Sequence, residues 1–353
     1  MILSRQEVRR ILAEIKELKS DQPWIDFHVN PYEVIYNRFE HHPNPHAEGV
    51  WSLKPVPYSP PEITPLRIDD GPSEEYNSNN KDQLKSYYQL ILQKHFFHIG
   101  HRVILDQMAL SGIDKCVMLP VFQPATNGRR EMEFMFKAYG KDERFILGYC
   151  IPNSVKEDEI ADDIKRARQI YKIAAVKFNA NIMAIDLAKP KGINRLRAIL
   201  KACADYNLSL VIHGGRSELL WDSESRDYAL LDNMADTLVN YSTGTTIISH
   251  AGFFGFKLRE IKSDLMPLIE NILCSNANIY LNTAGLELNV LKIIFNRIDS
   301  DRIVFGSDFP YFLQWGSLVK IWFIIKNLHN SNYNLFKKII SQNPQSILQG
   351  KDK

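Results

Sequence analysis

The sequence predicts an α/β protein built as a (β/α)8 TIM barrel. Two observations support this prediction: eight short runs of nearly continuous apolar residues, and amphipathic helical segments between them. Parallel strands that are buried on both faces need such runs. Eight strands that alternate with helices match the count of a closed barrel, and no glycine-rich nucleotide-binding turn favours an open sheet instead. The runs lie at 23–29, 114–120, 144–150, 173–178, 208–213, 245–250, 278–283 and 302–308.

The first element is an amphipathic helix over residues 4–19. Ser4 and Glu7 have the spacing of a capping box, and apolar residues then recur at helical spacing. Such a face can bind a membrane surface or pack against protein, and we expect it to pack over one end of the barrel. We therefore predict a helical segment at 1–22, followed by a single barrel at 23–350.

The helices between the strands follow the 3.6-residue period of an amphipathic helix. The clearest patterns lie at 157–170, 193–206, 263–273 and 288–298.

One long segment interrupts this alternation. Between the first strand and a helix that we predict to start near Asp82, about fifty residues are rich in proline and aromatic side chains. Nine of the seventeen prolines lie between Pro31 and Pro72. The aromatic content argues against disorder. A loop after the first strand emerges at the C-terminal end of the barrel, where active sites lie, so we predict a lid or pocket wall at 31–80.

Composition excludes several classes of protein. The 43 Lys and Arg against 41 Asp and Glu give a net charge of +2, which does not suggest a nucleic-acid partner. The N-terminus is too charged for a signal peptide, and no run reaches the ~18 apolar residues that cross a bilayer. The four cysteines are scattered and are expected to be reduced. We expect a cytoplasmic protein with a small-molecule substrate, no nucleic-acid or membrane partner, and a homodimer as one assembly open to it.

Polar residues close several of the predicted strands. His28, His213, His250 and Asp308 each stand at the end of an apolar run. In a barrel, the C-terminal ends of the strands share one mouth. A single histidine there is more often a hydrogen-bonded structural residue than a ligand. Three imidazoles and a carboxylate together are costly to bury without a function, and imidazole suits zinc or iron, so the set predicts a catalytic metal site.

The ordered set of segments resembles the amidohydrolase superfamily, in particular the branch that includes aminocarboxymuconate-semialdehyde decarboxylase. The resemblance covers nearly the whole chain from residue 23. The matching segments are IDFHVN, SGIDKCVMLP, AAVKFNAN, LVIHGG, IISHAG, NIYLNTAG, RIVFGSDFPY and IISQNPQSIL. What the resemblance implies is a barrel of the metal-dependent hydrolase type with a mononuclear site.

In that branch the metal ligands come from strands 1, 5 and 8. Carried over to this sequence, His28, His213 and Asp308 would bind one divalent ion, with Zn²⁺ as the first candidate. The resemblance places His250 beside the metal-bound water, where it would help to polarise water or substrate. A divalent ion lowers the pKa of bound water toward ~7, and His250 or Asp308 can take or return the proton.

The sequence departs from the family pattern at two positions. Asn30 stands where the strand-1 motif usually has a second His, and Asn179 stands where K-x-H is common after strand 4. An amide oxygen is a poor ligand for Zn²⁺. We therefore carry Asn30 as a doubtful metal ligand and expect the ion to bind weakly or not at all if this ligand is lost. Asn179 is assigned to the substrate.

Two cations near the strand ends have alternative roles. In binuclear relatives the strand-4 lysine is carbamylated and bridges two metals. Without a second strand-1 His, we expect Lys177 to be a plain ammonium that binds an anionic substrate group or pairs with a carboxylate. Arg216 could clamp a carboxylate in bidentate fashion. The alternative for both is a charge on the rim.

Six other histidines are less informative. The three in the predicted lid, namely His41, His42 and His46, are minor candidates for substrate contact. The three in or near the helix that starts around Asp82, namely His95, His98 and His101, are expected to be structural.

The function that these residues predict is hydrolysis of a C–N or C–O bond in a small, anionic organic molecule by metal-activated water. The first alternative is a non-oxidative decarboxylase on the same site. A third is a binding barrel that has lost catalysis, as Asn30 would allow. Release of carbon dioxide separates the first two, and binding without turnover or metal marks the third.

Overall fold

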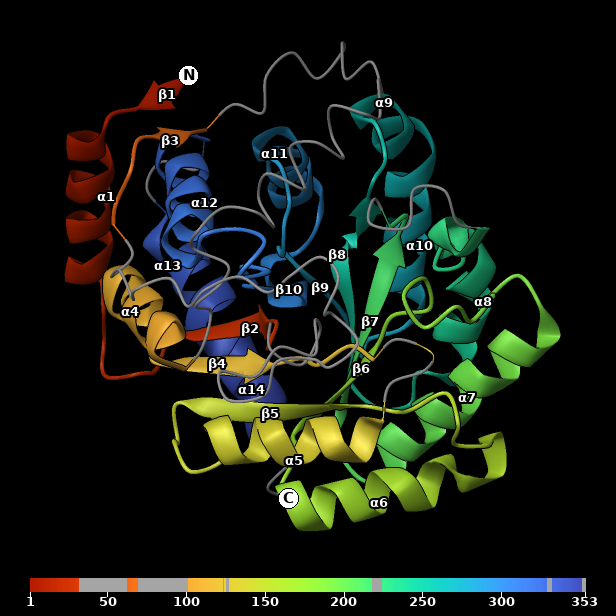
Figure 1. The fold of residues 1–353 in the computed structure, drawn as a ribbon. Helices are drawn as coiled ribbons and strands as arrows, with labels where there is room; N and C mark the ends of the chain where they lie inside the picture. The colour runs from red at the N-terminus through yellow and green to blue at the C-terminus, as the bar shows by residue number, and fades with distance from the viewer. Residues whose placement is uncertain are drawn as a thin grey trace, which may run out of the picture.

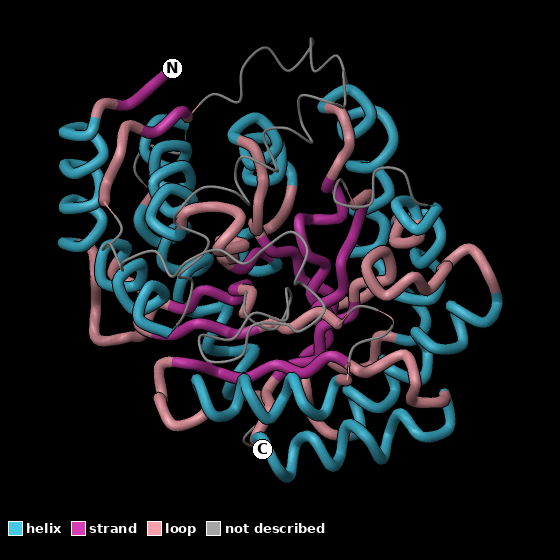
Figure 2. The backbone as a smooth tube through the Cα atoms, in the orientation of Figure 1, coloured by secondary structure: helices cyan, strands magenta, loops and turns pink. Residues whose placement is uncertain are grey.

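The computed structural model describes residues 1–31, 62–68, 101–122, 124, 127–217, 224–328 and 332–350. Within them, eight strands form one parallel sheet that helices surround (Figure 1, Figure 2). In order around the sheet these are β2 (Ile25–Val29), β4 (Lys115–Met118), β5 (Phe145–Cys150), β6 (Ala175–Phe178), β7 (Ser209–Gly215), β8 (Thr246–Phe254), β9 (Ile279–Asn282) and β10 (Ile303–Val304).

The first and last strands meet and close the sheet. The amide of Phe27 donates to the carbonyl of Phe305 at 2.9 Å, and the amide of Asn30 donates to the carbonyl of Phe309 at 2.8 Å. Every neighbouring pair of strands in between is parallel. The eight predicted strand positions and the (β/α)8 barrel class are therefore confirmed.

The helices form the outer layer (Figure 1). The longer ones are α1 (Arg5–Glu17), α4 (His101–Ser111), α5 (Gly128–Tyr139), α6 (Ile160–Tyr171), α7 (Pro190–Asp205), α8 (Leu231–Tyr241), α10 (Met266–Ser275), α11 (Leu288–Arg297) and α12 (Gln314–Leu328). Short helices are α9 (Leu258–Glu260), α13 (Tyr333–Lys337) and α14 (Asn343–Gln349). Single turns of 3₁₀ or π helix lie at η3 (Glu157–Glu159), η5 (Glu224–Asp227), η6 (Ile261–Leu265), η7 (Ser300–Arg302) and η8 (Lys338–Gln342).

Helix α1 begins at the predicted capping box. The side chain of Ser4 accepts from the amide of Glu7, and the Glu7 carboxylate accepts from the amide of Ser4. Its buried face packs against the outer helices α4 and α12, and Lys16 Nζ donates to the carbonyl of Ala109 in α4. The apolar face of α1 therefore packs against protein, as expected, but it packs against the outer helices and not over one end of the barrel. In the described part of the chain, no helix combines the length and apolar character needed to span a membrane.

Little of the predicted lid can be described. Residues 32–61 and 69–80 of the 31–80 segment lie outside the described residues, as do His41, His42, His46, His95, His98 and the helix start near Asp82. Within the segment, β3 (Leu66–Arg67) pairs antiparallel with β1 (Ile2–Leu3) at the N-terminus. His101 begins α4, where its Nε2 lies 3.1 Å from a carboxylate oxygen of Asp142.

The barrel interior is filled by apolar side chains. One layer is made by strand residues, and Ile347 from α14 packs against it, so this helix covers the N-terminal end of the barrel. The layer comprises Ile25, Phe27, Val117, Leu119, Ala175, Val211, Ile247 and Val304. A second, larger apolar core lies between the sheet and the helices. Because the interior is packed, polar side chains can gather only beyond this layer, at the mouth.

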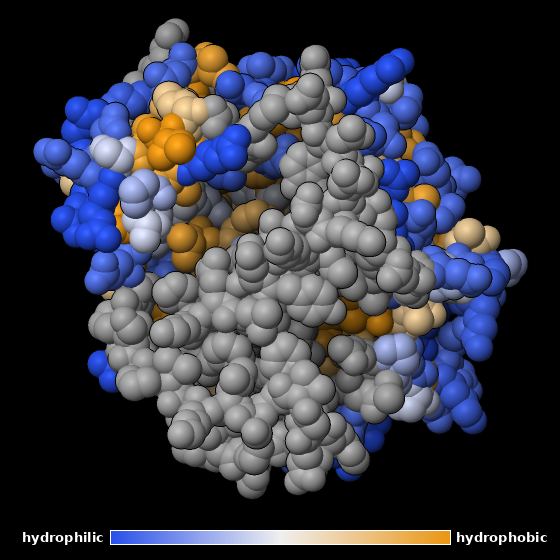
Figure 3. Space-filling view, turned by 45° about the horizontal axis from the view of Figure 1, so that its top comes forward, coloured by the Kyte–Doolittle hydropathy of each residue, from blue (hydrophilic) through white to orange (hydrophobic). Residues whose placement is uncertain are grey.

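The outer surface is mostly polar. Figure 3 shows hydrophilic residues over most of the described surface on that face, with apolar residues in smaller groups between them. This is the surface expected of amphipathic helices that turn their apolar faces toward a barrel.

Candidate active site

Strand periodicity positions the first polar residues of the mouth. Side chains alternate along a strand, so residues two apart share a face. Ala175, Val211 and Ile247 belong to the interior layer. Lys177, His213 and Ser249 follow each of these by two residues and are buried. The barrel thus carries a polar layer directly beyond its apolar plug, at the C-terminal ends of the strands.

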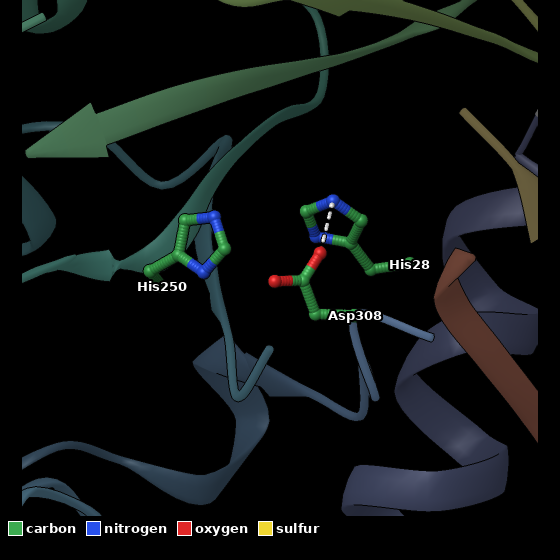
Figure 4. Close-up of side chains that lie close together, drawn as sticks. All are labelled: His28, His250 and Asp308. Carbon is green, nitrogen blue, oxygen red and sulfur yellow. Dashed lines mark ion pairs between the residues drawn. The ribbon is translucent and has the colours of Figure 1, made fainter. Parts of the chain in front are cut away.

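His28, His250 and Asp308 form the centre of this layer (Figure 4). One potential ligand atom from each side chain lies within 4.8 Å of the other two. His28 Nε2 lies 3.5 Å from Asp308 Oδ1, and the two imidazole rings lie 5.4 Å apart between centroids. All three side chains are buried. They come from β2, from β8 and from the segment just after β10.

Two of these residues have strained backbones. His250 has φ +56° and Asp308 has φ +64°, in the left-handed region that residues with a Cβ adopt rarely. Each such residue costs on the order of 1 kcal/mol or more, and such residues concentrate at functional sites. Hydrogen bonds hold both backbones in this conformation, since the amide of His250 donates to Asn282 Oδ1 and the amide of Asp308 donates to the carbonyl of His28.

Asn282, at the end of β9, sets the proton of His28. Its Oδ1 accepts from the amides of His250 at 2.9 Å and Ala284 at 3.2 Å, which fixes the side-chain amide. Its Nδ2 therefore faces His28 Nδ1 at 3.1 Å, where it must donate. Burial, followed by the charge of Lys177, holds the pKa of His28 well below 6.5, so the ring is neutral. The single proton of His28 then sits on Nε2.

His250 has the opposite arrangement. Its Nδ1 lies 2.8 Å from the carbonyl of Ala284, which can only accept, so Nδ1 carries the proton. Burial, followed by the charges of His213 and Lys177, holds the pKa of His250 well below 6.5. The neutral ring therefore has its free lone pair on Nε2, where it can accept a proton or bind a cation.

Asp308 is a carboxyl with a raised pKa. Burial raises its pKa from 3.8 to about 7, against the lowering effects of the Asn30 hydrogen bond and of the Lys177 charge. The amide nitrogen of Asn30 donates to Asp308 Oδ1 at 2.8 Å and to the carbonyl of Phe309 at 3.2 Å. Asn30 and His28 thus reach the same carboxylate oxygen, as expected for two residues on one side of strand β2. Asn30 presents a donor there, and its oxygen does not face Asp308.

Lys177 supplies a buried amine to the same group. Its Nζ donates to Ser249 Oγ at 2.9 Å and lies 3.3 Å from His28 Nε2. Burial lowers its pKa to about 7, although the Asp308 carboxylate favours the charged form. Burial thus disfavours the charged form of both groups, while the charge of each favours the charged form of the other.

The other candidate residues do not belong to this cluster of potential ligand atoms. His213 stacks edge-on against His250 with centroids 4.9 Å apart, but its Nε2 lies near the carbonyl of Arg216. The Arg216 guanidinium lies 3.4 Å from carboxylates of both Asp227 and Glu260. These pairs match the role of a rim charge, and the substrate clamp stays a prediction. Asn179 caps a turn by accepting from the amide of Ile182.

A protein-family model for amidohydrolases matches residues 118–348. The chain belongs to the amidohydrolase family. This match spans more than half of the sequence and includes His213, His250 and Asp308.

Solved structures with the same fold support this assignment at the level of architecture. The amidohydrolase resembles an uncharacterised TIM-barrel protein from Bordetella bronchiseptica with a TM-score of 0.61, 14% identity and coverage of 94% of this chain and 100% of that one. It resembles a 5-carboxyvanillate decarboxylase from Novosphingobium aromaticivorans, solved with bound manganese, with a TM-score of 0.56, 14% identity and coverage of 94% and 98%. A 2,6-dihydroxybenzoate decarboxylase gives a TM-score of 0.55, 13% identity and coverage of 94% and 99%.

One curated protein also matches by sequence. The phosphopantetheine adenylyltransferase of Campylobacter fetus subsp. fetus is 27% identical over 160 residues, which cover 42% of this chain and 97% of that protein. A match at this identity over less than half of the chain does not place it in that protein's family.

The sequence analysis did not identify the buried polar residues that hold the strands of the amidohydrolase site together. The carboxylate of Asp26 accepts from the amide and hydroxyl of Ser307 and from Gln314 in α12, which ties β2 to β10. By simple alternation Asp26 would share the side of His28, but the pairing of β2 with β4 shifts in register between Asp26 and Val29. Burial raises the pKa of Asp26 to about 6. Only its place two residues before His28 signalled a role.

The donor set has the right elements for a divalent cation, since two imidazoles and a carboxylate suit Zn²⁺ or Mn²⁺. The hydrogen bonds made by the two histidines are less favourable for metal binding. A ligating histidine normally donates its other N–H to an acceptor. His250 does so, whereas His28 meets the donor amide of Asn282 and keeps its proton on Nε2. The site can therefore bind an ion through these three residues only after the His28 proton has moved.

Proposed function

We propose that this amidohydrolase is a non-oxidative decarboxylase that acts on a small acid whose carboxylate is attached to a conjugated carbon. The observation that carries this proposal is the pairing of a buried amine, Lys177, with a buried carboxyl, Asp308, whose pKa is raised to about 7. Decarboxylation needs an acid to protonate the carbon that the carboxylate leaves, and a positive charge can bind and position that carboxylate. Both groups are buried at the mouth of the barrel.

The residues divide the reaction as follows. The ammonium of Lys177, held by Ser249, binds the substrate carboxylate. Asp308, oriented by Asn30, donates its proton to the carbon that bears the carboxylate. The bond between that carbon and the carboxylate breaks, its electron pair returns to the conjugated system, and carbon dioxide leaves. The Asp308 carboxylate then regains a proton from solvent, and the neutral His250 is placed to relay it.

Two observations favour this reaction over the hydrolysis expected from sequence. Hydrolysis needs Asp308 as a base, whereas burial favours its protonated form up to about pH 7. The proteins of similar fold include two decarboxylases, of 5-carboxyvanillate and of 2,6-dihydroxybenzoate, both of which are aromatic acids. This likeness supports the reaction class and leaves the substrate of this chain to experiment.

We also propose that a divalent ion, Zn²⁺ or Mn²⁺, binds at His28, His250 and Asp308 with low affinity. When bound, such an ion supplies positive charge to substrate oxygen atoms. It competes with the protons on His28 Nε2 and Asp308 and with the nearby charge of Lys177. His213, which the family resemblance placed among the ligands, lies against His250 with ring centroids 4.9 Å apart, and its role as a ligand stays a prediction.

The test is release of carbon dioxide from a panel of aromatic carboxylic acids, by chelated protein and by protein supplied with Zn²⁺ or Mn²⁺. We expect Asp308→Asn to lower turnover ~10²–10⁴-fold, the effect of a lost acid–base group. Asp232→Asn on the exposed start of α8 is the matched control and should leave turnover unchanged. Because the reaction needs Asp308 protonated and Lys177 charged, turnover should fall as pH rises through about 7. Hydrolysis products without carbon dioxide would refute the proposal.

A further inference from the structure

A cavity of about 490 Å³ lies at the end of the barrel opposite the mouth. It is lined by residues at the N-terminal ends of strands, including Ile25 of β2 and Ile146 of β5, and by the C-terminal helix α14. Arg168, in the last turn of α6, belongs to the same lining. The volume is within the range of roughly 300–1,000 Å³ that small-molecule sites occupy.

Three cations line this cavity. Lys115 opens β4, Arg168 lies in the last turn of α6, and Lys172 follows that helix directly. In the described part of the chain, no carboxylate lines the cavity, and none forms an ion pair with these three side chains. Arg216, by contrast, has two carboxylate partners. A concave wall with three positive charges concentrates anions.

The rest of the lining divides into an amide side and an apolar side. Asn207, Gln345 and Gln349 supply side-chain amides, although Asn207 already donates to the carbonyl of Gly350 and Gln345 to Ser341 Oγ. The apolar side is made by Ile25, Ile146, Ile173, Leu208 and Leu348. A ligand that matches both sides has an anionic head and an apolar body.

Lys172 occupies an unusual position for its residue type. Its φ of +52° lies in the left-handed region that glycine adopts without strain, and this place after a helix is usually glycine. The charge of Lys172 also favours the helix end electrostatically, but Arg168 in the same turn already provides that effect. A strained lysine at the cavity wall is consistent with use of its side chain.

We propose that this cavity is a second ligand site, separate from the active site, for a small organic anion with an apolar body. Lys115, Arg168 and Lys172 hold the anionic head, and the isoleucines contact the body. The proposal does not depend on decarboxylation, because it rests on residues at the opposite end of the barrel.

Binding is tested on the full chain by calorimetric titration with benzoate, with benzamide as its neutral counterpart, and with inorganic phosphate. Chemical shifts of labelled isoleucine methyl groups locate the site. We expect benzoate to shift Ile146 and Ile173, benzamide to bind at least tenfold more weakly, and the double variant R168Q/K172Q to raise the dissociation constant at least tenfold. K165Q, on the exposed face of α6, is the matched control.

The alternatives are distinguishable. If phosphate binds at these methyl groups as tightly as benzoate, the site takes the anion alone and the apolar part of the proposal is wrong. If benzoate shifts only groups near the mouth, or R168Q/K172Q leaves the affinity at Ile146 unchanged, the site does not exist. If K177M weakens benzoate binding but benzoate still shifts Ile146, the loss is confined to the active site and the second site is intact.

Discussion

The hydrogen bond between Asn282 and His28 should control whether the site takes a proton or a metal ion. In the structure, Asn282 Nδ2 donates to His28 Nδ1 at 3.1 Å and holds the ring proton on Nε2. Replacing Asn282 with Asp exchanges this donor for a carboxylate oxygen. The other oxygen keeps the contacts with the amides of His250 and Ala284. The His28 proton then moves to Nδ1, and the Nε2 lone pair faces Asp308.

The size of the effect follows from the bonds exchanged. To bind an ion, the wild-type His28 must give up one hydrogen bond, which contributes ~1 kcal/mol, and leave a buried donor unsatisfied at a cost of ~1–3 kcal/mol. Both penalties vanish in N282D, and each ~1.4 kcal/mol corresponds to a tenfold change in affinity. Because outer hydrogen-bond partners of metal ligands typically change affinity 10–100-fold, we expect Zn²⁺ to bind ~10–100-fold more tightly to N282D.

The assay is competition for Zn²⁺ against a chelating dye at constant pH, together with the ¹⁵N chemical shifts of His28. N278D, on the exposed approach to β9, is the control for an added carboxylate and should leave affinity unchanged. The nitrogen shifts should report protonation at Nε2 in the wild type and at Nδ1 in N282D. An unchanged affinity together with an altered tautomer would refute the reasoning, as would nanomolar binding by the wild type.

Two further outcomes are expected. Asn30 donates to Asp308 and lowers its pKa. N30A should therefore raise that pKa and move the alkaline limb of the turnover–pH profile up by about one pH unit. A limb that does not move would count against Asp308 as the acid. Burial raises the pKa of Glu131 in α5 from 4.5 to about 7, and its Oε2 has no hydrogen-bond partner within the described residues. A carboxyl with a raised folded pKa loses stability as pH rises between these values. E131Q should therefore be ~1–2 kcal/mol more stable than the wild type at pH 8, measured by urea unfolding, and as stable as the wild type near pH 4.5. The full pKa shift would correspond to ~3 kcal/mol, and nearby solvent reduces this value. E133Q is the exposed control on the same helix, and a stability gain that is independent of pH would contradict the explanation.

The fold was predictable because each strand has a local sequence pattern that indicates it. A buried parallel strand must be apolar along its length, and all eight runs are strands in the structure. The position of α1 was less predictable. Its apolar stripe and its capping box specify a helix with one buried face, but the partners α4 and α12 are set by where the chain runs afterwards. Local periodicity contains no information about such distant contacts.

The site was predictable in part for a related reason. Strand ends meet at one mouth, so His28, His213, His250 and Asp308 could be grouped from the order of the chain alone. The three whose potential ligand atoms cluster in the structure are His28, His250 and Asp308. The sequence could not predict the direction in which each side chain turns. The Nε2 of His213 turns toward the carbonyl of Arg216, and Asp26 turns away at a register shift in β2. Asn282 drew no attention, because its effect depends on which end of its amide faces His28.

Asn30 shows how one departure from a family pattern can alter the chemistry of its neighbours. A second strand-1 histidine would offer a lone pair to a cation, whereas the Asn30 amide offers a hydrogen to Asp308 Oδ1. The proton of His28, held on Nε2 by the Asn282 amide, faces the same site. These donors favour an arrangement in which protons occupy the places of metal–ligand bonds. The raised pKa of Asp308 then becomes useful, because a carboxyl that holds its proton near neutral pH can deliver it to carbon. Under the proposed function, the same barrel and the same strand ends support acid catalysis by residues of the chain, and Asn30 and Asn282 set the balance between proton and metal.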